Sequence, residues 1–264
     1  MNIPFTKAHG TGNDFIIIYS EDVPSLTINS NLIKQLCHRQ TGIGADGLLL
    51  LSPDNTLDFK MDYYNNDGSW ETMCANGARC AVRYMYKRGL IKNKTTFFAG
   101  DGPHDAEVGN DRNIKLQMKS PKYKTDLIAV GGFKGFHVDS GARHFAVSVK
   151  DLSKINVFTS GQKIRYSNEF LPKGINVNFF TKLSTNSIYV KTYEKGIEKT
   201  VLSCGSGSVA AAYHASQSLG LHSPVDVTVP GGKLIIEFDN NWESVWLTGI
   251  AILVFNSTIN LENL

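Results

Sequence analysis

The chain has 264 residues, of which 42% are hydrophobic and 19% charged, and its formal net charge at pH 7 is +3. This composition is typical of a soluble globular protein with one large domain or two ordinary ones. So small a net charge does not indicate a nucleic-acid or membrane partner, and no apolar run reaches the length of a membrane span. The first residues lack the apolar stretch of a secretory signal, so we expect a cytoplasmic protein.

In the first part of the chain, apolar patterns predict strands at 3–8 and 15–20, a helix at 29–38, an apolar run at 48–51, and strands at 58–64, 95–98 and 114–118. Two glycine-rich loops, His9–Asp14 and Gly42–Gly47, interrupt this series. The glycines of the first loop let the backbone and the Asn13 amide approach a ligand closely, although a plain hairpin turn fits this loop equally well. The second loop is not a dinucleotide-binding fingerprint, because the required spacing and the following helix are missing.

The pattern then begins again after a short crossover at 119–124. Strands are predicted at 136–140, 145–149, 176–180, 187–193, 225–229, 233–238 and 245–253, with a turn at 141–144. Strands and helices do not alternate regularly, which indicates an α+β fold. We expect two halves, 1–121 and 122–264, with the last strand, at about 252–264, packing back on the first half.

Two similar stretches, 74–81 and 204–211, each read as a turn of small residues opening a helix, which we expect at 78–86 and at 208–215. Placing Cys74 on Cys204 also aligns Gly77 with Gly207. A thiol at a helix start lies near unpaired N–H groups and the positive end of the helix dipole, which favours the thiolate and lowers the thiol pKa. The same N–H groups bind carboxylates. We therefore expect one central helix and one reactive thiol in each half.

The remaining cysteines, Cys37 and Cys80, fall inside predicted helices, where we expect them to be packed. Four cysteines in a chain this long do not suggest a disulfide framework. Zinc is also not indicated, since no close cysteine pair is matched by a second and the histidines are scattered. We expect neither a metal nor a cofactor.

Several chemistries fit two separated cysteines. They could be small core residues, or belong to a cysteine hydrolase with His144 as its base, or to a redox protein, although redox cysteines are usually close in sequence. Two thiols acting as base and acid on opposite faces of one carbon need no cofactor, and they fit the duplication best. The substrate of such chemistry would be a small molecule that carries a carboxylate.

Six motifs lie along most of the chain: His9–Phe15, Gly42–Gly47, Asn65–Ser69, Met73–Cys80, Gly174–Phe179 and Ser203–Gly207. Together they make the sequence resemble the diaminopimelate epimerase family, whose members are cofactor-independent. The resemblance implies two pseudo-symmetric α/β halves around an active-site cleft. It implies epimerisation of LL-diaminopimelate to the meso form in lysine and peptidoglycan biosynthesis, with Cys74 and Cys204 as the alternating base and acid.

The resemblance also implies roles for other residues. His144 and Glu194 match polar groups beside the reacting centre, although His144 also fits an ordinary hydrogen-bonded histidine and Glu194 an exposed turn carboxylate. The positions that match substrate-binding residues are Asn13, Asn65, Ala75, Asn76, Asn176, Gly205 and Ser206. A small amino acid is the expected partner, and a homodimer is expected.

Departures from the family pattern cluster at the end of the substrate that does not react. Ala142 and Arg143 stand where Asn and Pro are usual, and Lys195 replaces an arginine. Lysine keeps the charge but loses the planar fork that fits a carboxylate. We expect Arg143 to restore it if its side chain enters the cleft. A racemase acting on histidine or another diamino acid stays an alternative. The paired cysteines argue against a phenazine-type isomerase and a binding-only relative.

Overall fold

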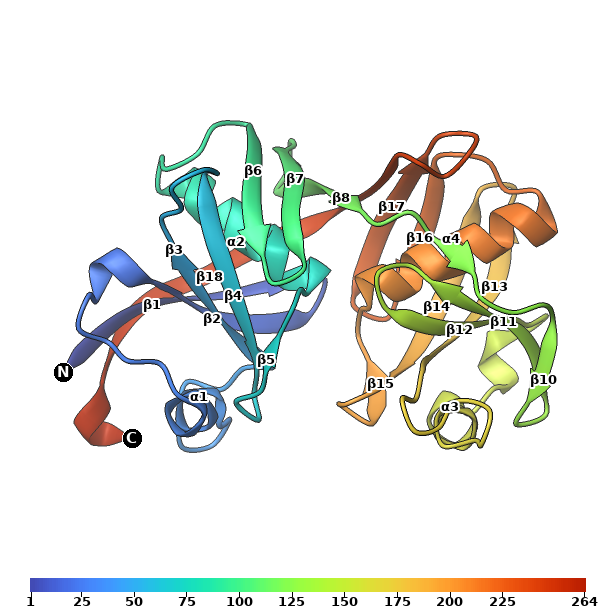
Figure 1. Ribbon diagram of the computed structural model, residues 1–264, viewed down its shortest axis with the longest axis horizontal. Coiled ribbons are helices and arrows are strands. Elements are labelled where there is room, and N and C mark those ends of the chain that lie inside the picture. The colour runs from blue at the N-terminus through green and yellow to red at the C-terminus, as the bar shows by residue number, and fades with distance from the viewer. The chain divides into compact units, whose positions relative to one another are not determined.

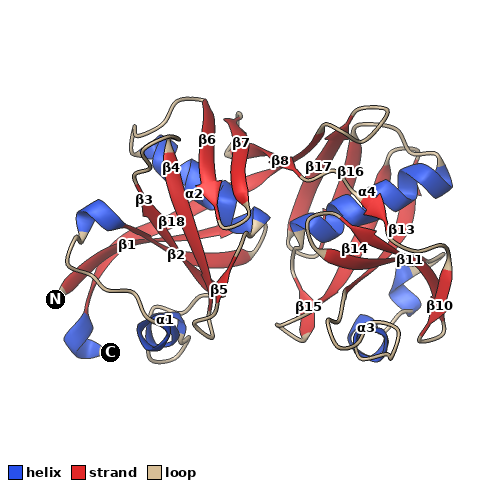
Figure 2. Cartoon of the chain, in the orientation of Figure 1, coloured by secondary structure: helices blue, strands red, loops and turns tan.

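The computed structural model describes residues 1–264, apart from the side chain of Asn263. The chain forms a mixed α/β protein of two compact units, the first of residues 1–116 with 249–264 and the second of residues 117–248 (Figures 1 and 2). Strand β8 (Asn113–Met118) leads from the first unit into the second, and β18 (Val245–Asn260) leads back. Each unit is described by itself.

The first unit consists of β1 (Asn2–Gly10), β2 (Asn13–Tyr19), a short 3-10 turn (Ser20–Asp22), α1 (Ser30–Cys37), β3 (Gly47–Ser52), β4 (Phe59–Asn65), β5 (Trp70–Glu71), α2 (Ala75–Lys87), β6 (Lys94–Ala99), β7 (Gly102–Val108) and most of β8. Strand β18 pairs with β1 in antiparallel fashion, so the last part of the chain closes the first unit.

The second unit consists of β9 (Lys122–Tyr123), β10 (Ile128–Val130), β11 (Phe133–Asp139), β12 (Arg143–Ser148), α3 (Val157–Arg165), β13 (Asn176–Ser184), β14 (Ser187–Glu194), β15 (Lys199–Val201), α4 (Gly205–Leu219), β16 (Val225–Val229) and β17 (Gly232–Phe238). A second 3-10 turn (Leu152–Lys154) precedes α3, and a third (Leu261–Asn263) follows β18 in the first unit.

The two units repeat one topology. In the first, β1 pairs antiparallel with β2, β2 parallel with β3, β3 antiparallel with β4, β4 parallel with β6, and β6 antiparallel with β7. In the second, β11, β12, β13, β14, β16 and β17 pair in the same order and directions. In each unit one helix follows the second strand of the series, α1 after β2 and α3 after β12. Another helix follows a short additional strand, α2 after β5 and α4 after β15. The duplication puts α2 and α4 at equivalent positions.

In the first unit, the sheet is buried on both faces, which explains the continuous apolar runs Phe15–Ile18 and Leu48–Leu51. Alternate side chains of these runs pack against α1, in a cluster with Ile33 and Leu36. The others face α2, whose first turn approaches closely because Gly77 has no side chain. A Cβ at Gly77 would lie 3.0 Å from Leu49 and 3.5 Å from Phe15.

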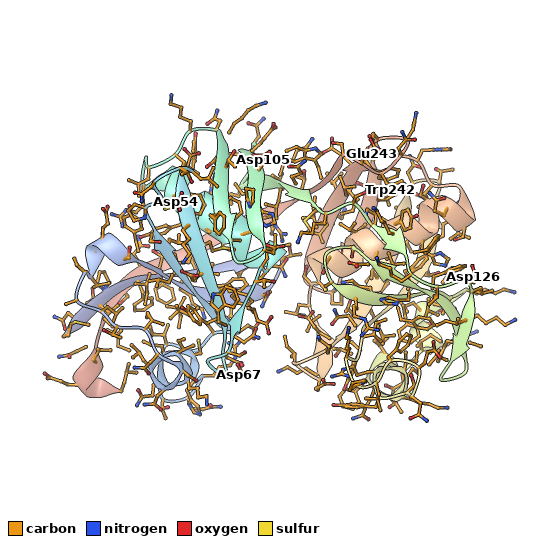
Figure 3. All side chains as sticks on the ribbon, in the orientation of Figure 1. Asp54, Asp67, Asp105, Asp126, Trp242 and Glu243 are labelled. Atoms are coloured by element: carbon orange, nitrogen blue, oxygen red, sulfur yellow. The ribbon has the colours of Figure 1, made fainter. Side chains whose placement is uncertain are left out.

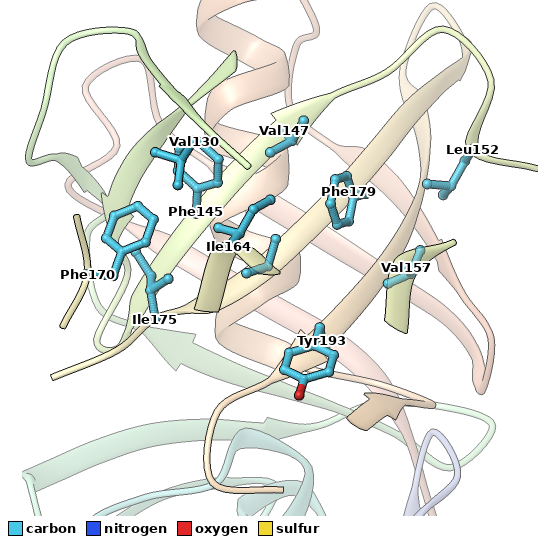
Figure 4. Packing of buried hydrophobic residues seen from close by; sticks show 11 residues of the cluster. Val130, Phe145, Val147, Leu152, Val157, Ile164, Phe170, Ile175, Phe179 and Tyr193 are labelled. Carbon is cyan, nitrogen blue, oxygen red and sulfur yellow. The ribbon is translucent and has the colours of Figure 1, made fainter. Parts of the chain in front are cut away.

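In the second unit, α3 covers one face of the sheet and α4 the other. Phe145, Val147, Phe179 and Tyr193 form the core on the α3 face (Figure 4). On the other side lies Trp242, which is labelled in Figure 3. It packs against Tyr213 of α4 and stacks on Phe238, with ring centroids 3.6 Å apart in the latter pair. The polar site residues of this unit lie on the α4 face.

Several predicted elements are confirmed and others need correction. The first helix begins after Asn29, whose side chain accepts a hydrogen bond from the Leu32 N–H. The helices that follow the two cysteines start at residues 75 and 205, earlier than expected, because each cysteine is itself the N-cap. Helix α3 was not expected, although Asn156 is an N-cap of the favoured type. His144 lies on β12, not in the preceding turn.

Candidate active site

Cys74 and Cys204 occupy the same structural position in the two units. Each is the N-cap of its helix, with φ −130° and ψ 116° at Cys74 and φ −131° and ψ 111° at Cys204. The carbonyl oxygen of each accepts the first helical hydrogen bond, from Ala78 and Ser208 respectively. Both cysteines are partly exposed as whole residues. The unpaired N–H groups of each first turn therefore lie next to the cysteine, at the end of the helix where anions bind.

In the first unit, the predicted residues Asn13 and Asn76 join Cys74 directly. The Cys74 thiol donates to Asn13 Oδ1 at 3.7 Å, and Asn76 Nδ2 donates to the same oxygen at 3.2 Å. Gly10 permits this close approach, since a Cβ there would lie 2.7 Å from the Asn76 carbonyl oxygen. Ala75 lies in the same turn and is buried. These residues form one site.

Asn65, the other asparagine expected in this unit, is hydrogen-bonded within its own hairpin. It ends β4, where its amide oxygen accepts from Tyr63 and its amide nitrogen donates to Ser69 at 3.2 Å. A substrate contact by Asn65 stays a prediction.

Arg79, one turn into α2, lies in the motif Met73–Cys80, but the sequence predicted no role for it. Its side chain is completely buried and donates to the Ala75 carbonyl, Thr11 Oγ1 and Asn76 Oδ1 at 3.1, 3.0 and 2.8 Å. All three acceptors are uncharged, and burial lowers the pKa of Arg79 to about 10. The guanidinium is a buried positive charge behind the first turn of α2, where it favours an anion bound at that turn.

In the second unit, Ser206 connects Cys204 to His144. The Ser206 hydroxyl lies 3.9 Å from Cys204 Sγ and 2.9 Å from His144 Nε2. Its backbone carbonyl accepts from Ser140 Oγ at 2.8 Å. Gly207 brings the helix against β13, since a Cβ there would lie 2.2 Å from Asn178 Nδ2. Cys204, Gly205, Ser206 and His144 therefore form a second site.

The electrostatics around Cys204 correct one expectation from the sequence. Burial raises the pKa of the Cys204 thiol well above its usual value, and Glu194 raises it further. The Gly207 N–H acts in the opposite direction. Loss of hydration therefore outweighs the helix start, and the isolated site favours the neutral thiol rather than the thiolate.

Asn176 holds the segment that follows β14. Its amide oxygen accepts from the Lys195 N–H at 2.9 Å, and its amide nitrogen donates to the Arg143 carbonyl at 3.2 Å. Glu194 ends β14 and is close enough to Cys204 to raise its pKa. The structure thus places Asn176, Glu194 and the Lys195 backbone beside the Cys204 site.

The expected role of Arg143 at the distal end is not supported by its position. Side chains alternate along β12, so Arg143 shares the face of Phe145, which packs in the core against α3. His144 points to the opposite face, toward Ser206. In keeping with this, burial and then the nearby Arg143 lower the pKa of His137, a β11 residue that pairs with Phe145 of β12. This position does not favour Arg143 as a substitute for the arginine that Lys195 replaces, and the expected role of Arg143 stays a prediction.

Sequence reasoning also missed Asn178 and Asp46. Asn178 accepts from His144 Nδ1, and Asp46 accepts from Asn13 Nδ2, each at 2.8 Å. A signal for Asn178 was present, since it follows Asn176 by two residues on a strand and so shares its face. Asp46 lies in the glycine-rich loop Gly42–Gly47, but the sequence predicted no role for it.

Within the residues that the structure describes, no group of three or more His, Cys, Asp or Glu side chains is arranged to hold a metal ion. In the same residues, no helix is both long and apolar enough to cross a membrane.

Comparison with known proteins decides the family. The model of the family described as diaminopimelate epimerase matches residues 5–124 and 136–254. The chain belongs to the diaminopimelate epimerase family. It is 39% identical over 274 aligned positions to the diaminopimelate epimerase of Aquifex aeolicus, covering 98% of both chains. It is 41% identical over 258 positions to that of Flavobacterium psychrophilum, covering 96% of this chain and 98% of the relative.

Solved structures extend the comparison of the fold. A hydroxyproline epimerase from Agrobacterium vitis has a TM-score of 0.73 at 14% identity, covering 98% of this chain and 93% of that one. A phenazine biosynthesis protein of the PhzF family from Bacillus anthracis has a TM-score of 0.72 at 14% identity, covering 99% and 100%. At these identities the likeness shows the fold, which this epimerase family shares with both groups.

Proposed function

We propose that this chain epimerises LL-diaminopimelate to meso-diaminopimelate with Cys74 and Cys204 as the two acid–base groups. The observation that carries the proposal is the equivalence of the two thiols, each an N-cap with the same backbone conformation at the same point of a duplicated fold. Their sequence context belongs to a family of isomerases matched over nearly the whole chain. The proposal requires the two units to face one ligand across a cleft.

The α-hydrogen of an amino acid is weakly acidic, so the carbanion must be stabilised. The N–H groups of the first turns, at Ala75–Asn76 and Gly205–Ser206, are suited to bind the α-carboxylate. One thiolate removes the α-proton from one face while the other thiol delivers its proton to the opposite face. One C–H bond breaks and another forms, and the enzyme ends with its single proton on the other sulfur.

His144 fits a positioning role in this scheme. It is fully buried, and burial lowers its pKa to about 4, so it is neutral near pH 7. Through Ser206 it fixes the first turn of α4 beside Cys204. Glu194 raises the pKa of Cys204 and so favours its protonated form. Asn13, Asn65 and Asn176 remain the proposed contacts to the substrate.

Recognition of the distal end of the substrate departs from the usual family pattern, because Ala142 and Lys195 replace the usual Asn and Arg. Lys195 is the cation that the proposal assigns to the distal carboxylate. Its backbone is anchored by Asn176 at 2.9 Å, which supports a defined position for this residue.

The test is α-proton exchange in deuterated water with reduced enzyme, offering LL-diaminopimelate beside histidine, lysine and ornithine. Deuterium should enter diaminopimelate, and Cys74→Ala and Cys204→Ala should each abolish epimerisation. Deuterium in another amino acid, with diaminopimelate untouched, would keep the two-thiol chemistry and replace the substrate. Full activity in either cysteine variant would remove that thiol from the mechanism.

A further inference from the structure

A chain of side-chain hydrogen bonds in the first unit has a fixed direction, because both of its ends are charged. At one end, the Arg79 guanidinium can only donate, so the atom of Asn76 that it contacts at 2.8 Å is the amide oxygen. The amide nitrogen of Asn76 must then face Asn13, to which it donates at 3.2 Å. The orientation of Asn76 is thus set by a buried cation.

At the other end stands Asp46, which can only accept when ionised. Asp46 Oδ2 accepts from Asn13 Nδ2 at 2.8 Å, and Asp46 Oδ1 pairs with Arg39 Nη2 at 2.8 Å. Both ends therefore require the same orientation of the Asn13 amide, with its nitrogen toward Asp46 and its oxygen toward Asn76. That oxygen is the atom 3.7 Å from Cys74 Sγ.

We propose that Asp46 is a positioning residue that holds the Asn13 amide oxygen against the Cys74 sulfur, so that the Cys74 thiolate is less favoured than it would be beside a reversed amide. An acceptor beside the sulfur stabilises S–H and disfavours S⁻, whereas the N–H of a reversed amide would stabilise S⁻. The relevance of Cys74 to catalysis rests on the proposed function, but the orientation of Asn13 does not.

Asp46→Asn is the sharpest variant, because it keeps the shape and changes the hydrogen bonding. One amide oxygen cannot serve both Asn13 and Arg39 as two carboxylate oxygens do, so the amide of Asn13 loses its fixed partner. Asp14→Asn is the matched control. Asp14 also pairs with Arg39, at 2.8 Å, and is a nearby negative charge, but its carboxylate does not contact the Asn13 side chain.

The measurement is the pH dependence of Cys74 alkylation by iodoacetamide, in the full chain with Cys204→Ala, followed by peptide mass mapping. We expect Asp46→Asn to move the alkylation midpoint to lower pH by roughly one unit, and Asp14→Asn to leave it within a few tenths of a unit. Asn13→Ala, which removes the acceptor altogether, should shift the midpoint in the same direction as Asp46→Asn.

Equal midpoints for Asp46→Asn and Asp14→Asn would overturn the proposal, since the effect would then be one of charge alone. An unchanged midpoint in Asn13→Ala would overturn it independently, and that variant does not depend on how Asp46→Asn folds. The readout requires no turnover. A failure of the proposed epimerisation is therefore distinguishable from a failure of this inference.

Discussion

The Nε2 atom of His144 lies 2.9 Å from the Ser206 hydroxyl, while its Nδ1 atom lies 2.8 Å from the amide oxygen of Asn178. Asn178 Nδ2 donates to Thr192 Oγ1 at 2.7 Å, so the amide oxygen faces the imidazole. The hydrogen-bond network thus assigns the proton of His144 to Nδ1, and Nε2 accepts from Ser206. A neutral, fully hydrogen-bonded imidazole holds the start of α4 beside Cys204.

The two buried histidines His144 and His214 should make the protein acid-sensitive. Burial lowers the pKa of each to about 4, whereas the unfolded chain titrates at about 6.5. The unfolded state therefore binds protons first as the pH falls, and stability declines between about pH 6.5 and about pH 4. Each residue should remove about 2 kcal/mol of unfolding free energy between pH 7 and pH 5. Urea unfolding at the two pH values measures this, and His214→Gln should halve the decline. An unaltered slope in that variant would contradict the expected burial effect.

Gly207 and Gly77 occupy equivalent first-turn positions but have different surroundings. A Cβ at Gly207 would lie 2.2 Å from Asn178 Nδ2 and 3.2 Å from Cys204 Sγ. Gly207→Ala should therefore displace the His144 hydrogen-bond network and destabilise the protein by about 1–3 kcal/mol. Gly77→Ala is the control, since its nearest contact would be a flexible leucine methyl at 3.0 Å, and we expect a smaller loss. Thermal unfolding of both variants tests the ranking, and equal losses would refute it.

The sequence pattern predicted the strands with continuous apolar runs, such as Phe15–Ile18, because burial on both faces leaves no room for polar residues. It also predicted the two thiol-bearing helices, because a cysteine followed by small residues is a local signal. The face on which Arg143 lies could not be predicted, because alternation depends on where β12 begins. Partners such as Asn178 and His144, which are 34 residues apart in the chain, are joined only by the pairing of β12 with β13.

The four cysteines should differ sharply in reactivity. Cys37 is buried, which raises the pKa of its thiol to about 12, and Cys80 is completely buried with its pKa raised further. Cys74 and Cys204 are partly exposed. Native protein treated with iodoacetamide near pH 8 should be modified first at Cys74 and more slowly at Cys204, because burial raises the pKa of the Cys204 thiol. The other two should react only in urea. Mass mapping decides between the outcomes, and early labelling of Cys37 or Cys80 would show that the packing is looser than described.

The ion pair of Arg165 with Glu198 should stabilise the segment that carries Lys195. Arg165 Nη2 lies 3.0 Å from Glu198 Oε1, which also accepts from the Gly196 N–H at 3.0 Å. Burial alone would raise the pKa of Glu198, but the Gly196 N–H, the Tyr166 hydroxyl and Arg165 together hold it below its usual value.

Glu198→Gln keeps the shape of the side chain but removes its charge. The Arg165 side chain is only 13% exposed and that of Glu198 31%. We therefore expect a loss of about 1–2 kcal/mol of unfolding free energy after allowance for solvent screening. The KM for the amino-acid substrate should also rise, because the Lys195 backbone is held by the same turn.

Glu107→Gln is the control for this prediction. It breaks the Lys94–Glu107 ion pair, whose side chains are 82% and 38% exposed, and should cost about 0.5 kcal/mol or less of unfolding free energy. If urea unfolding gives the two variants the same loss, the Arg165 pair is no stronger than a surface ion pair. A KM that stays at the parent value would separate the turn from substrate binding.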